Sequence, residues 1–390
     1  MRVHVHRSLS PAAGAVEVVE RKGLGHPDTI CDAIAEHVCV RLCLAYRERF
    51  GTILHHNVDK VLLCGGAARP AFGGGEVLAP LESYLAGRAA AEHGGAKIRV
   101  HDVAIDACRE WLGAHLRGLD VERHVRIESR LRPGSTDLTR LFAREGVPPA
   151  NDTSCGAGFA PLTDLEATVL AVERALNHAD TKRTHPEIGE DIKVMGVRQD
   201  GRIQLTIGCA FVGRHVAGLE DYARKKDAAI DLVRAAASSA TALGVDVTLN
   251  AADDLDRGEI FLTVTGTSAE AGDDGEVGRG NRVSGLITPY RPMTLEAAAG
   301  KNPVTHVGKL YSLVATSIAA AVTRELAGVD DASCVLVSDI GHRVDEPRIV
   351  DVGAGPGAAS VAAVTEIARS HLAGMGALRE ALLAERLGVC

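Results

Sequence analysis

The sequence lacks any CxxC pair, although it contains nine cysteines among its 390 residues. An odd number of cysteines without such a pair argues against a disulfide framework and against a zinc site. The N-terminus has no apolar core of signal-peptide length, and no segment approaches the roughly 18–20 apolar residues of a membrane span. Together these absences predict a protein of the reducing cytoplasm.

Positive charge is also scarce, because the formal net charge is −8 and there is no basic tail or stripe. Nucleic-acid binding proteins normally carry a basic patch that pairs with phosphates. The charge distribution therefore argues against nucleic acid as the main partner. A mildly acidic protein that binds a polyanion needs local cations or bound metal ions.

Low-complexity segments and flexible linkers are absent, and helix-like and strand-like stretches alternate instead. The predicted helices span residues 28–50, 307–326 and 361–387, with one more behind the Thr163-x-x-Glu166 capping box. The predicted strands span residues 55–64 and 259–265, with a hairpin formed by 192–197 and 203–211. Hairpins mixed with helices predict an α+β fold rather than a doubly wound parallel sheet. The length predicts two or three packed subdomains, whose boundaries cannot be separated in the sequence.

The first stretch that carries chemistry is VERKGLGHPDTICD, residues 19–32. His26 and Asp28 flank Pro27 where the first predicted helix begins, and free N–H groups and the helix dipole favour an anion there. A histidine at this place can stabilise a charged leaving oxygen, and an aspartate can hold a divalent cation. The alternative is that Asp28 only caps the helix and His26 is a surface residue.

Two short motifs follow, HHNVDK (residues 55–60) and FGGGEV (residues 72–77). Adjacent side chains on a strand point to opposite faces, which argues against a zinc site made of His55 and His56. Asp59 and Glu76 are better candidates for binding a cation or an amine. Glu76 could equally be a solvated carboxylate at a glycine turn.

Two further polar motifs occur in the middle of the chain, ANDTSCGAGFAPLT (residues 150–163) and GEDIKVMGVR (residues 189–198). Asn151 and Asp152 begin a loop of small residues that can admit a ligand, although an Asx-turn would explain them as well. Asp191 and Lys193 lie on the same face of a predicted strand, as a metal–polyphosphate site would require. A surface ion pair is the simpler explanation for them.

The last motif runs from Gly266 to Arg282 and combines five glycines, four acids and two arginines; the segment GKNPVTHVGK, residues 300–309, follows it. Glycine backbone and arginine suit phosphate, whereas carboxylates repel it. Both belong in one site when Mg²⁺ bridges carboxylates to a polyphosphate. The Walker A spacing is absent. The residues therefore predict a metal-dependent enzyme acting on a nucleoside triphosphate or similar polyphosphate.

These motifs, in this order, closely resemble those of the archaeal-type S-adenosylmethionine synthetases (methionine adenosyltransferases). The resemblance runs from about Val19 to the segment SDIGHRVDEP, residues 338–347. It implies three similar α+β subdomains around a pseudo-threefold axis, interleaved in sequence, within one catalytic unit spanning residues 1–390. It also implies a cytoplasmic homodimer with active sites between the subunits, and it leaves a tetramer open as the alternative.

The implied reaction is the attack of L-methionine sulfur on C5′ of ATP, which gives S-adenosylmethionine and tripolyphosphate. The tripolyphosphate is then hydrolysed to pyrophosphate and phosphate. The implied cofactors are Mg²⁺ and K⁺. The catalytic residues implied by the resemblance are His26, Lys193, Arg279, Lys301 and His306. The implied substrate contacts are Glu76, Asn151, Asp152, Asp191 and Lys309. The implied metal ligands are Asp28 and Asp273 for Mg²⁺ and Asp59 near the monovalent cation.

The sequence departs from the archaeal-type pattern at three positions. Val58 and Lys60 stand where HHNTDQ is usual, and Phe159 stands where tyrosine is common. If these side chains face the site, substrate range or cation requirement could differ; if they face the core or solvent, nothing follows. They leave two rival hypotheses open: a relative that uses a methionine analogue or another nucleophile, and a non-catalytic regulatory partner of an active subunit.

Overall fold

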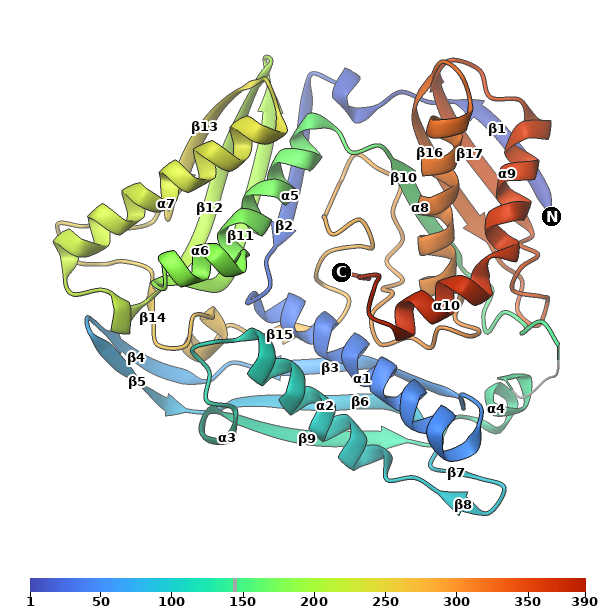
Figure 1. Ribbon diagram of the computed structural model, residues 1–390, viewed down its shortest axis with the longest axis horizontal. Helices are drawn as coiled ribbons and strands as arrows, with labels where there is room; N and C mark the ends of the chain where they lie inside the picture. The colour runs from blue at the N-terminus through green and yellow to red at the C-terminus, as the bar shows by residue number, and fades with distance from the viewer. Residues whose placement is uncertain (143–145) are drawn as a thin grey trace.

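The computed structural model describes residues 1–142 and 146–390, and it shows an α+β fold built on three main sheets with helices packed against them (Figure 1). Each sheet combines strands from distant parts of the sequence. The predicted α+β class is therefore confirmed. Within these two ranges, no helix has both the length and the apolar character that crossing a membrane requires.

The sheet nearest the N-terminus contains the first strand and the last two strands of the chain. Its order is β1 (Arg2–Arg7), β17 (Ile349–Pro356), β16 (Val329–Val337) and β10 (Cys155–Ala160). Helices α8 (Val307–Glu325) and α9 (Val361–Ala373) pack against it. Gly156 and Gly158 allow this packing, because a Cβ atom at either position would lie within 2.5 Å of the α8 backbone. These glycines therefore serve helix packing, whereas the sequence suggested a ligand-admitting loop.

The second sheet is centred on the predicted hairpin. Its order is β13 (Gly244–Leu249), β12 (Arg202–Val212), β11 (Ile188–Gln199) and β2 (Val16–Lys22), with β14 (Leu262–Thr263) beside β12. Helices α5 (Asp164–Asn177) and α7 (Leu219–Ala240) pack together over it. The Thr163–Glu166 capping box is present at the start of α5, as predicted.

The third sheet has the order β15 (Gly275–Glu276), β3 (His56–Cys64), β6 (Leu81–Ala89) and β9 (Val125–Arg132). Helices α1 (Pro27–Phe50) and α2 (Val100–His115) pack together beside it. Smaller elements complete the fold: β4 (Ala67–Ala71), β5 (Gly74–Ala79), β7 (Glu92–His93), β8 (Ala96–Lys97), α3 (Val121–His124), α4 (Thr136–Phe142), α6 (Ala179–Thr184), α10 (Met375–Leu383), η1 (Pro11–Ala13), η2 (Gly213–His215) and η3 (Ser268–Ala271).

Two predicted elements differ from the structure. The strand predicted at 259–265 is reduced to the two residues of β14, because the Glu270 carboxylate binds the N–H groups of Val264 and Thr265, at 2.6 and 2.5 Å. The helix predicted at 361–387 is divided into α9 and α10 at Gly374. Both differences arise from local details that hydrophobic periodicity does not encode.

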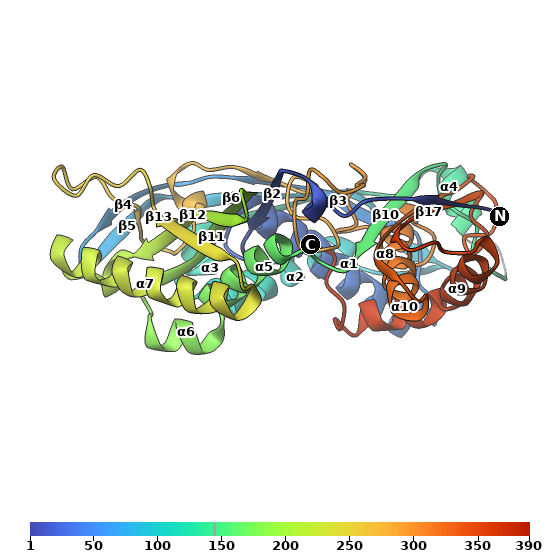
Figure 2. The same cartoon turned by 90° about the horizontal axis from the view of Figure 1, so that it is seen from above.

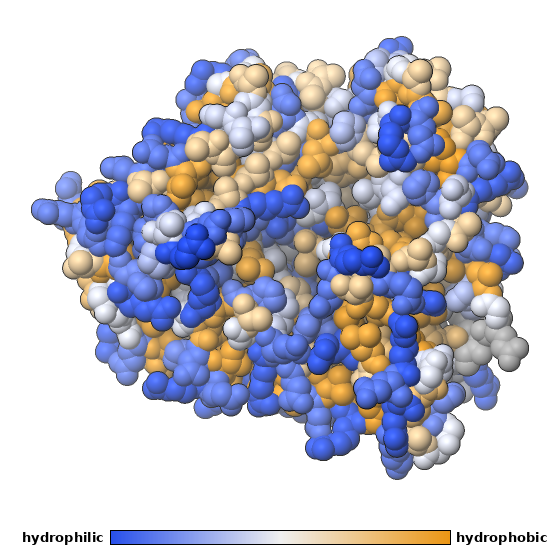
Figure 3. All heavy atoms as spheres, viewed as in Figure 1, coloured by the Kyte–Doolittle hydropathy of each residue, from blue (hydrophilic) through white to orange (hydrophobic). Residues whose placement is uncertain are grey.

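The molecule is flat, with helices such as α7, α9 and α10 on one side and most of the strands on the other (Figure 2). The helical side is shown in space-filling form in Figure 3, where hydrophilic residues predominate and apolar residues are visible in patches between them. The sheets thus have one face covered by helices, and their opposite faces are available to carry functional side chains.

Candidate functional site

The N-terminus of α1 places His26 and Asp28 side by side. His26 is the N-cap of α1, and its Nδ1 accepts a hydrogen bond from the Asp28 backbone N–H at 3.2 Å. In the neutral ring, Nδ1 is therefore the acceptor and Nε2 carries the proton. Burial lowers the pKa of His26 to about 4, so the neutral form prevails at pH 7.

Lys22, at the end of β2, connects the Asp28 carboxylate to the loop that carries Arg279. The Lys22 Nζ donates to Asp28 Oδ2 at 2.8 Å and to the Arg279 carbonyl at 2.8 Å. The Glu276 N–H donates to Asp28 Oδ1 at 3.0 Å. Burial alone would raise the pKa of Asp28, but the Lys22 and Glu276 hydrogen bonds outweigh it and lower this pKa. Asp28 is consequently ionised and available as an anionic ligand.

Strand β11 adds Asp191 and Lys193 to the same place. Asp191 is 5% exposed and its Oδ2 accepts from the Ser268 N–H at 2.9 Å, whereas Lys193 is exposed and lies 3.2 Å from Glu20. The pKa of Asp191 is raised to about 6, mainly by burial and partly by the negative charge of Asp273. The charges of Lys193 and Asp273 also act on His26. These residues form what we call the α1 cluster: Lys22, His26, Asp28, Asp191, Lys193, Asp273 and Arg279.

Two members of the α1 cluster have charged side chains that are not paired within the described chain. The side chains of Asp273 and Arg279 are exposed, and neither forms a hydrogen bond or ion pair with any described residue. An unpaired carboxylate and an unpaired guanidinium on one loop are suited to an external ligand that carries both metal and phosphate. The metal and polyphosphate roles of Asp273 and Arg279 stay predictions.

A second group of charges gathers around Lys301, and we call it the Lys301 cluster. Lys301 is 5% exposed, and its Nζ lies 3.3 Å from Asp59 Oδ2 and 3.2 Å from Glu296 Oε1. His306 is the N-cap of α8, with its Nε2 3.9 Å from Glu296 Oε1. Burial lowers the pKa of His306 to about 3, and the nearby Lys301 charge contributes. Both side chains are therefore held in a largely buried site, where the Lys301 ammonium lies between two carboxylates and the His306 ring is neutral.

Asn151 and Asp152 lie beside the start of α8, and their roles differ. The Asn151 Oδ1 accepts from the Val307 N–H at 3.0 Å, which fixes it against the helix that His306 caps. The Asp152 carboxylate accepts from the Thr153 N–H at 2.7 Å, one residue short of an Asx-turn, and the Asp152 carbonyl accepts from the Ser338 hydroxyl at 2.7 Å. The structure thus brings Asn151 close to the Lys301 cluster.

Glu76 and Lys309 lie outside both clusters. Glu76 is exposed on the β4–β5 hairpin, 3.8 Å from Arg69. Lys309 is fully buried, and its Nζ binds the two carboxylate oxygens of Glu36 at 2.8 and 2.6 Å. In this form of the chain, the Lys309 ammonium is engaged in an internal ion pair and is not directed at a substrate.

Sequence reasoning missed Lys22 and Asp32 in the first motif. Asp32 accepts from the Gly278 N–H at 2.7 Å, while its Oδ2 is buried with no hydrogen-bond partner. Burial raises the pKa of Asp32 to about 6. The i, i+4 spacing from Asp28 on a helix could have indicated that both carboxylates face the same glycine loop.

The two clusters are separate within one chain. Among the described residues, no hydrogen bond or ion pair joins a member of the α1 cluster to a member of the Lys301 cluster. The charges that act on His26 belong to its own cluster, and those that act on His306 belong to residues at or next to the Lys301 cluster. Each cluster holds cations and carboxylates that a magnesium–polyphosphate ligand would use.

Comparison with known proteins identifies the family. A sequence model of the S-adenosylmethionine synthetase (AdoMet synthetase) family matches residues 1–386. The chain belongs to this family. The resemblance predicted from the sequence motifs is thereby confirmed, and with it the prediction that the chain is an enzyme.

Curated relatives named S-adenosylmethionine synthase are similar over most of the chain. The probable S-adenosylmethionine synthase of Aquifex aeolicus is 55% identical over 340 residues, covering 86% of this chain and 85% of the relative. The enzyme of Aeropyrum pernix is 52% identical over 343 residues, covering 86% and 84%. That of Pyrococcus furiosus is 50% identical over 340 residues, again covering 86% and 84%.

The three departures from the archaeal-type pattern of this family lie in different surroundings. Val58 is fully buried in the core beneath α1, so its missing hydroxyl does not face a ligand. Phe159 is buried with its ring 4.4 Å from the Arg291 guanidinium, inside the protein. Lys60 is exposed, and its Nζ lies 2.7 Å from Asp59 Oδ1. Only Lys60 therefore touches a candidate site residue.

Proposed function

We propose that the chain is a methionine adenosyltransferase that joins L-methionine sulfur to C5′ of ATP and then hydrolyses tripolyphosphate to pyrophosphate and phosphate. The match to the family along residues 1–386 carries the proposal. The α1 cluster supports it, because a neutral, half-buried histidine lies near the Asp273 carboxylate, in the cluster whose loop also carries the unpaired Arg279 side chain.

The residues suit this reaction because a thioether is a neutral nucleophile that needs no general base. Catalysis then depends on positioning and on stabilising the leaving charge. The Nε2–H of His26 would donate to the oxygen that leaves C5′. Lys193 and Arg279 would bind the triphosphate on one side, and Lys301 and His306 on the other.

The carboxylates fit a hard divalent cation such as Mg²⁺, which prefers oxygen ligands. Asp28 is held ionised and Asp273 is uncommitted, so both would hold the metal. A bound Mg²⁺ would neutralise polyphosphate charge during the reaction. Asp59 would lie near a monovalent cation such as K⁺. Asp191, Asp152, Asn151 and Glu76 would contact the methionine or nucleoside end, and Lys309 would support them through Glu36.

The complete site is proposed to form between the two subunits of a homodimer, which can assemble further into a tetramer. No hydrogen bond or ion pair among the described residues joins the α1 and Lys301 clusters within one chain, as a site shared between two subunits would require. The three sheet-and-helix units are proposed to be similar, interleaved subdomains around a pseudo-threefold axis in a single catalytic unit. The nine free thiols suit a reducing cytoplasm.

The test is an assay of the purified chain with ATP, Mg²⁺ and K⁺, with and without L-methionine. Mass spectrometry would follow adenosyl products, phosphate and pyrophosphate. We expect S-adenosylmethionine to form only with methionine, together with equal amounts of pyrophosphate and phosphate. ATP breakdown without an adenosyl product would contradict the proposal, and so would the absence of any turnover.

The contact between Lys60 and Asp59 leads to a prediction about K⁺. The Lys60 ammonium already supplies a positive charge at the Asp59 carboxylate. We expect Lys60→Gln to increase the stimulation of kcat/KM by K⁺ about two- to five-fold, the equivalent of one exposed ion pair. Initial rates over a K⁺ titration at constant ionic strength would measure this effect.

Lys97→Gln is the matched control, because Lys97 is also an exposed lysine paired with a carboxylate, Glu92 at 3.9 Å, but on the β7–β8 hairpin. Its K⁺ response should equal that of the unmodified chain. Equal K⁺ responses of the Lys60→Gln and Lys97→Gln variants would show that Lys60 does not substitute for a cation.

A further inference from the structure

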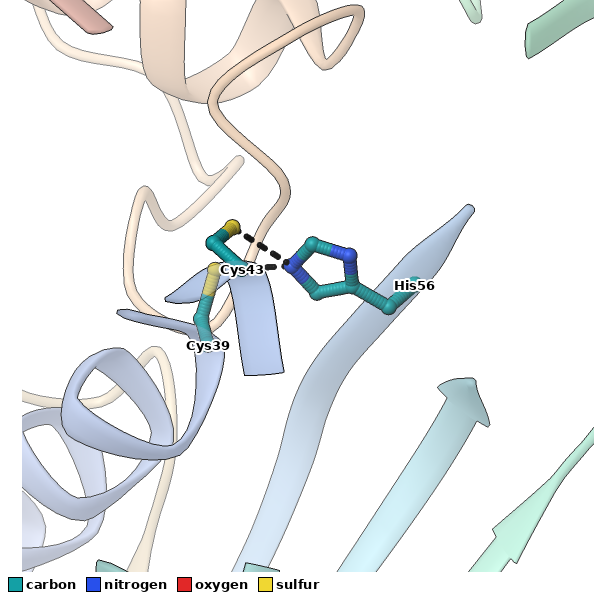
Figure 4. Close-up of side chains that lie close together, drawn as sticks. All are labelled: Cys39, Cys43 and His56. Atoms are coloured by element: carbon teal, nitrogen blue, oxygen red, sulfur yellow. Dashed lines mark hydrogen bonds between the residues drawn. The ribbon is translucent and has the colours of Figure 1, made fainter. Parts of the chain in front are cut away.

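Two cysteines and a histidine meet in the interior, next to the buried Lys309–Glu36 pair, whose ammonium lies 3.9 Å from Cys39 Sγ. Cys39 and Cys43 lie one turn apart on α1, and His56 begins β3. Figure 4 shows both sulfur atoms close to the same edge of the imidazole ring. All three side chains are at most 1% exposed. Within the described chain, this is the group of histidine, cysteine and acidic residues whose donor atoms converge closely enough to hold a metal ion.

The orientation of His56 is fixed by a bond on the far side of the ring. Its Nδ1 lies 2.8 Å from the Leu54 carbonyl oxygen, which can only accept, so Nδ1 carries the proton. Nε2 then presents its lone pair to the sulfur atoms. Metal-binding histidines are commonly oriented in this way, with the second ring nitrogen donating to a carbonyl or carboxylate.

The spacing of the donor atoms matches a metal site. The Nε2 atom lies 3.2 Å from Cys39 Sγ and 3.4 Å from Cys43 Sγ, and all three atoms lie within 4.8 Å of one another. Tetrahedral zinc with its usual bond lengths places nitrogen and sulfur ligands about 3.5 Å apart. Without an ion, the His56 lone pair can accept from one thiol while Cys39 donates to the Lys301 carbonyl; a metal ion would instead bind both sulfur atoms and Nε2 at once.

A fourth donor and the charge balance favour a divalent ion. The Cys39 Sγ lies within hydrogen-bond distance of the Lys301 carbonyl oxygen, at 3.2 Å, which makes this oxygen the candidate fourth ligand. The two negative charges of two thiolates would balance the two positive charges of a divalent ion. The neighbouring Lys309–Glu36 ion pair carries no net charge. A monovalent ion would leave one buried negative charge unbalanced, which is costly in the interior.

We propose that Cys39, Cys43 and His56 bind one structural Zn²⁺ ion, with the Lys301 carbonyl as the fourth ligand. Binding would release the two thiol protons to solvent. The ion would tie α1 to the start of β3 and to the turn that carries Lys301. It would therefore fix the positions of Asp59 and Lys301 without touching the substrates. The sequence argued against a zinc site, since it has no CxxC pair and since His55 and His56 point to opposite faces of a strand. That argument did not detect this site because its ligands come from two separate elements, α1 and β3.

The test measures metal in the full-length chain purified without chelators and with reductant. We expect inductively coupled plasma mass spectrometry to find one zinc per chain. Protein produced in medium that contains Co²⁺ should show the thiolate-to-cobalt charge-transfer bands and the d–d absorption bands of tetrahedral Co²⁺. Cys39→Ala and Cys43→Ala should each lower the bound zinc at least about ten-fold, because ligands matter more than their supporting residues.

Cys108→Ala is the matched control, because Cys108 is equally buried in the core and its hydrogen-bond contact, among the described residues, is with Ser83 at 3.9 Å. It should keep one zinc per chain. If the cysteine variants fail to fold, the zinc content and the cobalt spectrum of the unmodified chain still test the proposal. A chain that contains no zinc, shows no cobalt bands and has free Cys39 and Cys43 thiols would overturn the proposal, as would binding of Cu⁺ alone.

Discussion

Replacing His26 with asparagine is expected to lower kcat about 10²–10³-fold, the usual cost of losing one donor to a developing negative charge. Asparagine is among the best N-cap residues, so it should still accept the N–H bond that His26 accepts from Asp28. The helix start is thereby preserved, while the Nε2–H that would reach the leaving oxygen is lost. The loss should appear in kcat rather than in KM for methionine, because the donor acts on the transition state.

Initial rates of methionine-dependent S-adenosylmethionine formation would measure this loss, and a thermal melt would verify folding. The chain offers a matched control in His178, the N-cap of α6, whose Nδ1 accepts from the Asp180 N–H at the same 3.2 Å but whose ring is exposed. His178→Asn should keep full activity. If His26→Asn turned over as fast as His178→Asn, His26 would serve only as the cap of α1; the sequence had offered Asp28 as the cap and His26 as a surface residue.

Replacing Arg291 with methionine is expected to lower the free energy of unfolding by about 3–5 kcal/mol, the usual cost of removing one partner of a buried ion pair. The Arg291 side chain is 2% exposed. It donates to both Glu166 oxygens at 2.9 and 3.0 Å and to Asp331 at 2.7 Å. Methionine would leave two carboxylates buried without their cation, and it would remove the guanidinium that lies over the Phe159 ring.

Urea denaturation followed by circular dichroism would give this free energy. Arg202→Met is the control, because Arg202 also makes two bonds to one carboxylate, Asp246 at 3.1 and 2.7 Å, yet both side chains are more than half exposed. Exposed pairs contribute little, so this variant should unfold almost as the unmodified chain does. A similar small effect for Arg291→Met would mean that the network adds nothing beyond ordinary packing.

The elements that sequence analysis predicted correctly are governed by local signals. The helix beginning after His26 follows from its apolar periodicity, and α5 follows from the capping box between Thr163 and Glu166. Which strands share a sheet was not predictable, because β1 pairs with β17 from the other end of the chain. Such pairings depend on packing among distant segments, which leaves no short pattern in the sequence.

The candidate site was predictable to a similar extent. His26 and Asp28 were identified from the motif because the free N–H groups and the dipole at a helix N-terminus favour an anionic ligand. Lys22 was missed, since only the fold brings its ammonium to the Asp28 carboxylate. The sequence could not show that Lys309 is paired internally with Glu36. The catalytic and binding roles assigned to these residues stay predictions until the variants are measured.

The Glu36 carboxylate has a consequence for how this sequence can change over evolutionary time. One of its oxygens accepts both the Gly300 N–H at 3.0 Å and the Lys309 ammonium at 2.6 Å, so it joins the turn before Lys301 to the first turn of α8. Removing either charge alone would leave the other charge buried without its partner, which is strongly destabilising. Substitutions at positions 36 and 309 should therefore be inherited together, and an apolar pair is a natural joint replacement.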